Sequence, residues 1–120
     1  MTPNRENIRK WVEALRSGEY QQGTGYLQRD GQFCCLGVAC ELAGESKVQR
    51  LEAGTVDKVI YYGESGGEVS ARLLPPATRL WLGLTDRDVR LSNNPGAATL
   101  NDSGHTFAEI ADAIEKEYLS

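Results

Sequence analysis

The chain's three cysteines fall within seven positions of one another, in the segment GQFCCLGVACELAG. Cys34 and Cys35 lie where a helix is expected to begin, and the outward-pointing N–H groups of a helix start lower the pKa of a thiol. A papain-like cysteine hydrolase uses such a thiol with a histidine base that an Asp or Asn side chain orients. The chain has one histidine, His105, and Asn101 and Asp102 lie just before it. These residues form one candidate catalytic set.

The same residues also have a structural interpretation, which we favour. Thiols are among the most buried side chains, so CCLGVAC can form the apolar face of a helix built from small residues. His105 precedes the threonine expected to cap the last helix, where an exposed polar residue is common. Neither a metal site nor a cofactor is expected, because the cysteines lack C-x-x-C spacing and one histidine is too few for a distant second half-site. On this interpretation no residue is catalytic.

A second group of residues could bind a ligand. The segment YQQGTGYLQRDGQ places two glycines of a short loop beside Tyr26 and Arg29. A glycine-rich loop lets a ligand approach backbone N–H groups closely, although this one lacks the G-K-[ST] of a phosphate-binding P-loop. A plain connection between a helix and a strand is the alternative, because glycines punctuate loops of every kind.

Two further segments add polar side chains. Asn101 and Asp102 precede the last helix and could contact the hydroxyls or amides of a ligand, or could bond to their own turn. Four arginines from Arg72 to Arg90 could clamp a phosphate, or could be solvated surface residues. The candidate ligand-binding residues are therefore Tyr26, Arg29, Arg72, Asn101 and Asp102.

The elements that position these residues begin with a helix over 2–17, capped by Thr2 with Pro3 in the first helical position. Asp30-Gly31 predicts a two-residue hairpin turn between short strands. A helix over 34–43 follows, in which Gly37 either weakens the helix or marks a close contact between backbones.

The second half of the chain predicts another hairpin and two or three helices. The β-prone runs 56–62 and 68–74 flank a polar, Gly-rich tip. A short helix begins at Pro76 and ends at Gly83, GAATL could be a helical turn, and the last helix follows His105 with capping-box spacing. The prediction is one α+β domain over residues 1–120, with short antiparallel hairpins packed against the N- and C-terminal helices.

The composition limits partners and location. The formal net charge is −4, from 13 Lys and Arg against 17 Asp and Glu, which argues against non-specific binding to nucleic-acid backbones. No apolar run approaches the roughly 20 residues that span a bilayer, and the N-terminal segment lacks the apolar core of a signal peptide. We expect a cytoplasmic protein with no membrane partner, in a compartment where thiols stay reduced.

Two parts of the chain resemble a group of small phage and prophage proteins of unassigned function. The first holds WVEALRSGEYQQGTGYL and FCCLGVACELA, and the second holds LNDSGHTFAEIADAIE. The resemblance covers the chain up to Gly44 and again from Leu100. Phage proteins of this size often act as counter-defence factors, which bind a host protein or sequester a nucleotide-derived immune signal. The resemblance therefore implies a phage accessory protein in the host cytoplasm.

Three functions are compatible with these observations. The one we favour is binding or sequestration of a small anionic, nucleotide-like ligand without catalysis, by a protein that could form a homo-oligomer. The second is a papain-like cysteine hydrolase that uses the candidate catalytic set. The third is a protein–protein inhibitor of a host enzyme.

Overall fold

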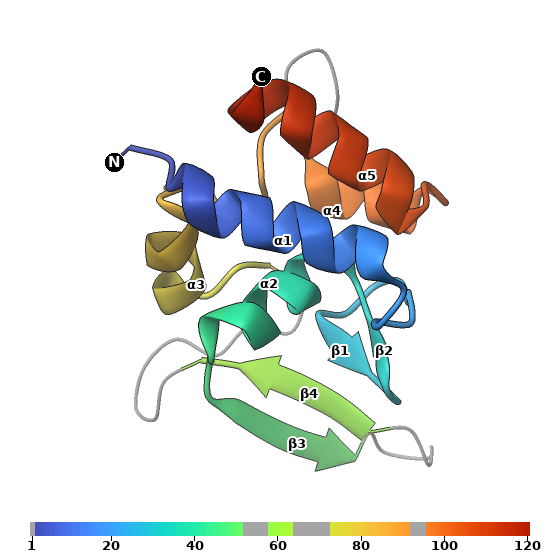
Figure 1. Ribbon diagram of the computed structural model, residues 1–120. Coiled ribbons are helices and arrows are strands. Elements are labelled where there is room, and N and C mark those ends of the chain that lie inside the picture. The colour runs from blue at the N-terminus through green and yellow to red at the C-terminus, as the bar shows by residue number, and fades with distance from the viewer. Residues whose placement is uncertain (1, 52–57, 64–72, 92–95) are drawn as a thin grey trace.

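The computed structural model of the chain describes residues 2–51, 58–63, 73–91 and 96–120 (Figure 1). The helices in these ranges are α1 (Arg5–Ser17), α2 (Cys35–Ala43), α3 (Pro76–Leu82), α4 (Ala97–Asp102) and α5 (Phe107–Ile114), which continues as a π-helix, η1 (Glu115–Leu119). The strands are β1 (Gln28–Arg29), β2 (Gln32–Phe33), β3 (Lys47–Leu51) and β4 (Lys58–Tyr62).

The elements stack in layers around α2 (Figure 1). α5 packs against α1, α1 packs against α2, and α2 lies between these helices and the sheet. Every residue from Cys35 to Cys40 is buried, because α2 packs against α1, α3, α4 and β2. Helices packed on a small antiparallel sheet make the fold α+β, as the sequence predicts.

The first hairpin forms at the predicted turn. Asp30 and Gly31 both have positive φ, 52° and 79°, which a two-residue hairpin turn requires. β1 and β2 pair antiparallel on either side of the turn, with Arg29 opposite Gln32. Directly opposed residues share one face of a strand pair, so the turn brings these two side chains to the same face of the hairpin.

The second predicted hairpin falls partly on residues that the structure does not describe. The run expected over 56–62 does contain β4, but β4 pairs antiparallel with β3 and with β1, so the strand order is β2-β1-β4-β3. The expected partner, 68–74, lies outside the described residues as far as residue 72. Leu74 is buried in the core and its N–H donates to the Arg87 carbonyl oxygen at 2.7 Å. β1 lies along one edge of β4, at Val59 and Ile60, and β3 lies along the other edge.

The terminal helices follow their sequence signals closely. α1 buries the predicted face of Ile8, Trp11, Val12 and Leu15. Its start differs from the prediction, because Asn4 rather than Thr2 is the N-cap and its side chain accepts from the Asn7 N–H at 3.0 Å. α5 carries the predicted capping box, in which Thr106 and Glu109 bond each other's backbone N–H groups.

Gly37 marks a close contact between backbones, the second of the two predicted meanings. A Cβ atom at this position would lie 1.8 Å from the carbonyl oxygen of Leu27. The Cys34 N–H donates to the same oxygen at 3.2 Å. The absent side chain therefore lets the start of α2 press directly against the segment that leads into β1.

Candidate functional site

The glycine-rich loop, residues 20–27, runs alongside β2. The Gly23 N–H donates to the Phe33 carbonyl oxygen at 2.7 Å, and the Phe33 N–H donates to the Gln21 carbonyl oxygen at 2.8 Å. These bonds form an isolated parallel bridge between Gln22 and Phe33. The first half of the loop is therefore paired like a strand, although its sequence predicts only a connection.

Asn101, in the last turn of α4, holds the loop from behind. It is fully buried. Its Oδ1 atom accepts hydrogen bonds from the Cys35 N–H at 3.1 Å and from Gln22 Nε2 at 3.0 Å. Its Nδ2 atom donates to the Gly23 carbonyl oxygen at 2.8 Å and to Asp102 Oδ1 at 3.4 Å. One amide thus connects the loop, the first residue of α2 and the end of α4.

Gln22 and Asp102 extend these connections. Gln22 Nε2 donates to the His105 carbonyl oxygen at 2.8 Å, and Gln22 Oε1 accepts from the Phe107 N–H at 3.2 Å. Asp102 Oδ1 accepts from the Gly25 N–H at 2.9 Å. Gly25 has φ of 84°, a left-handed conformation that glycine adopts without strain. The loop is therefore fastened to β2, to α4 and to the start of α5.

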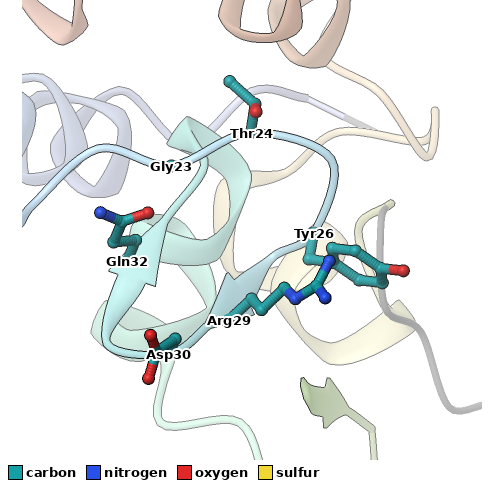
Figure 2. A pocket seen from close by; sticks show the side chains of 6 residues that line it. All are labelled: Gly23, Thr24, Tyr26, Arg29, Asp30 and Gln32. Atoms are coloured by element: carbon teal, nitrogen blue, oxygen red, sulfur yellow. The ribbon is translucent and has the colours of Figure 1, made fainter. Parts of the chain in front are cut away.

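A hollow of about 240 Å³ lies on the open side of the loop (Figure 2). We call it the loop pocket. The Arg29 guanidinium lies over the Tyr26 ring, 4.9 Å from the ring centroid, within the range of a cation–π contact. Gly23 lies against Gln32, since a Cβ at position 23 would be 2.7 Å from the Gln32 Cβ atom. The residues that line the loop pocket are Gly23, Thr24, Tyr26, Arg29, Asp30 and Gln32.

The structure separates the predicted ligand-binding residues into two groups. Tyr26 and Arg29 line the loop pocket. Asn101 is buried behind the loop with both polar atoms bonded to protein groups, and Asp102, although exposed, bonds to the Gly25 N–H through Oδ1. Arg72 lies outside the described residues. Two of the five therefore face the pocket, and two support the loop that forms its wall.

Three polar residues of the loop pocket were missed by the sequence prediction. Thr24 lies between the two loop glycines, Asp30 is in the hairpin turn, and Gln32 begins β2. The signal that could have found them is the pairing of Arg29 with Gln32 across the Asp-Gly turn, because that register places both residues beside the loop.

One family model matches the chain, over residues 4–118, and its description is a domain of unknown function, DUF8296. The chain belongs to this family. The match includes the loop, the hairpin and the α4 residues that hold them. No curated protein and no solved structure matches the chain.

The thiols of this DUF8296 domain are buried. Cys34 is the N-cap of α2, as predicted, and the nearby N–H groups of Leu36 and Gly37 lower its pKa. Burial acts more strongly in the opposite direction and raises the pKa of Cys34 to about 12. Burial also raises the pKa of Cys35 and of Cys40. Burial therefore outweighs the effect of the helix start, and these thiols are protonated at neutral pH.

The other members of the candidate catalytic set have separate structural contacts. The Cys35 Sγ atom donates to the Ala97 carbonyl oxygen at 3.4 Å. His105 is exposed, and its Nδ1 atom lies 3.8 Å from a Glu109 carboxylate oxygen. The Asp102 carboxylate bonds to Gly25. These contacts give the cysteine-hydrolase hypothesis no support, and it stays a prediction.

Two general features of the DUF8296 domain bear on ligands and partners. Among the described residues, no three His, Cys, Asp or Glu side chains are grouped so that they could hold a metal ion. Within the same ranges, every helix is too short or too polar to cross a membrane.

Proposed function

We propose that this DUF8296 protein binds a small nucleotide-like ligand in the loop pocket and does not convert it. The observation that carries the proposal is the loop itself, which is fastened to β2, α4 and α5 while its open side faces a polar hollow. A wall fixed before the ligand arrives reduces the entropy that binding must overcome. Arg29 supplies a guanidinium of the kind that binds phosphate oxygens in pairs.

Binding rather than catalysis is supported by the groups that surround the pocket. Its side chains are a hydroxyl, a phenol, a guanidinium, a carboxylate and an amide. The strongest nucleophiles of the chain, its cysteines, are buried in the first two turns of α2 and are protonated at neutral pH. The arrangement favours a site that recognises a ligand and retains it.

The resemblance to phage proteins suggests a use for such binding. A protein that holds a nucleotide-derived signal without converting it lowers the free concentration of that signal. We propose that this is its counter-defence role as a phage accessory protein in the host cytoplasm. Homo-oligomer formation and inhibition of a host enzyme stay predictions.

The proposal is tested by isothermal titration calorimetry and thermal unfolding with nucleoside monophosphates, cyclic nucleotides and ADP-ribose. At about 100 times its Kd, a ligand should stabilise the protein by about 2.7 kcal/mol. Arg29→Ala should weaken binding about tenfold to a hundredfold, because it removes a charge-assisted hydrogen bond. Arg9→Ala makes the same change of charge on the exposed side of α1 and should bind normally.

Absence of binding by every nucleotide tested, at millimolar concentration, would refute the proposed function. Equal affinity of the Arg29→Ala and Arg9→Ala variants would place the ligand somewhere other than the loop pocket. The unfolding midpoint of each variant without ligand shows whether a loss of affinity comes from a loss of fold.

A further inference from the structure

We infer that the loop pocket holds the ribose-phosphate part of the ligand and leaves the base outside, an inference that rests on the proposed function. Size is the first argument. Pockets that enclose a whole drug-sized ligand have volumes of roughly 300–1,000 Å³. The loop pocket, at about 240 Å³, is smaller than that range. A nucleotide therefore has to place part of itself outside.

The second argument is which part the walls suit. Base recognition uses flat apolar surface for stacking, often an aromatic face. Among the described residues that line the loop pocket, the one aromatic ring is that of Tyr26, and the Arg29 guanidinium lies over it (Figure 2). The remaining side chains, from Thr24, Asp30 and Gln32, are polar. Such walls suit a moiety that carries many hydroxyls and an anionic group.

The third argument is the pair of opposite charges. Arg29 and Asp30 are neighbours in sequence and both line the pocket. A carboxylate repels phosphate but accepts hydrogen bonds from sugar hydroxyls, as acidic side chains do with the ribose in dinucleotide-binding folds. The two charges therefore assign an orientation, with the phosphate at Arg29 and the ribose hydroxyls at Asp30. Gln32, on the same face of the hairpin as Arg29, can donate to either group.

This assignment predicts different affinities for ligands that the proposed function alone does not distinguish. A phosphate without the sugar should bind weakly, because the Asp30 carboxylate repels it and the ribose hydroxyls that this carboxylate would bind are missing. A nucleoside without phosphate should bind weakly, because nothing in it pairs with Arg29. Exchange of one base for another should change little, because the base lies outside the pocket.

The test is competition calorimetry with AMP as the reference ligand and with ribose 5-phosphate, CMP, adenosine, 2′-deoxy-AMP and inorganic phosphate as competitors. Ribose 5-phosphate and CMP should compete within about threefold of AMP, and the other three should compete at least about tenfold less well. Asp30→Asn suits the second arm, because asparagine tolerates the positive φ of this turn position. It should reduce the preference for AMP over 2′-deoxy-AMP to about twofold or less.

Glu13→Gln, which removes one negative charge from the exposed side of α1, is the matched control and should keep that preference. Tenfold discrimination between AMP and CMP, or strong competition by adenosine, would overturn the inference while the proposed function stands. A variant Asp30→Asn that keeps full preference for the ribose would overturn the assigned orientation. If ribose 5-phosphate binds and no nucleotide does, the proposed function fails and the assignment of the pocket stands. If none of these compounds binds, both fail.

Discussion

Replacement of Asn101 by alanine tests the hydrogen bonds that fix the glycine-rich loop. The variant removes both polar atoms of a fully buried side chain and leaves four protein groups without that partner. Two of them are backbone groups, the Cys35 N–H and the Gly23 carbonyl. The others have further contacts, because Gln22 also bonds to the start of α5 and Asp102 to Gly25.

The magnitude follows from how deeply each group is buried. Cys35 is fully buried, so its N–H is shielded from water and its loss of a partner should cost about 1–3 kcal/mol. This bond also takes the place of a helix cap, since the Cys34 side chain makes no capping hydrogen bond among the described residues. Gly23 is half-buried, so water can satisfy part of its carbonyl and the cost there should be about 1 kcal/mol. The expected total is a loss of about 2–4 kcal/mol in the free energy of unfolding.

Urea unfolding at neutral pH, followed by circular dichroism, measures this loss. A loss of about 3 kcal/mol should lower the urea midpoint by about 1 to 3 M for a protein of this size. Asn7→Ala is the control, because its Nδ2 atom makes one hydrogen bond, to the Trp81 carbonyl oxygen at 2.8 Å, and alanine suits its helix. The control should lose about 1 kcal/mol or less. If Asn101→Ala loses no more free energy of unfolding than the control, the hydrogen bonds of Asn101 do not stabilise the protein as we infer.

Three other predictions concern the core and the last helix. Gly37→Ala should lower the free energy of unfolding by more than about 3 kcal/mol, because its Cβ would lie 1.8 Å from a backbone oxygen. Gly18→Ala, whose Cβ meets nothing within 4 Å, should lower it by only about 1 kcal/mol, and equal urea midpoints of the two variants would contradict this. The Cys34 contribution to stability is fully present below the unfolded thiol pKa of about 8.5 and should decline by about 1.4 kcal/mol per pH unit from there to about pH 12, because burial raises its folded pKa to about 12. Urea titrations between about pH 7 and 10.5 should show a shallower decline in Cys34→Ala, and an unchanged slope would refute the assignment. Thr106→Ala removes the side chain that caps α5 and should lower the free energy of unfolding by about 1 kcal/mol. Thermal unfolding measures this loss against the exposed control Thr24→Ala, and identical melting temperatures of the two variants would contradict a stabilising capping box.

Sequence signals within a few residues correctly predicted the elements that are determined by neighbouring residues. The hairpin turn needs two residues that tolerate positive φ, and the pair Asp30-Gly31 does so. The capping box of α5 likewise involves only four consecutive residues, from Thr106 to Glu109. β3 was missed because its sequence, KVQRL, is short and charged, and because its strand state comes from pairing with β4 rather than from propensity. The same long-range pairing gives β4 two partners, β1 and β3, that its own sequence does not indicate.

The candidate site was predicted only in part, because some of its residues are marked by local sequence and others are placed by contacts with distant segments. Tyr26 lies in the loop that the glycines mark and Arg29 lies in β1 directly after it, so a local pattern finds both residues. The role of Asn101 depends on groups 66 and 79 positions away in the sequence, Cys35 and Gln22. A polar residue before a helix can equally face a ligand or bond to a distant loop, and only the packing of α4 decides between these roles.

Under the proposed function, the Asn101 side chain serves both the fold and the binding of the ligand, and the two effects can be measured separately. A ligand that enters a fixed loop does not have to order it, whereas a ligand that enters a loosened loop must supply that ordering, at about 1–2 kcal/mol for each backbone residue fixed. Asn101→Ala should thus weaken binding in the loop pocket although Asn101 lies behind the wall. Arg29→Ala should weaken binding with a smaller loss of stability than Asn101→Ala, because Arg29 is half-buried whereas Asn101 is fully buried. Only a pocket whose wall is held from behind predicts that contrast between the two variants.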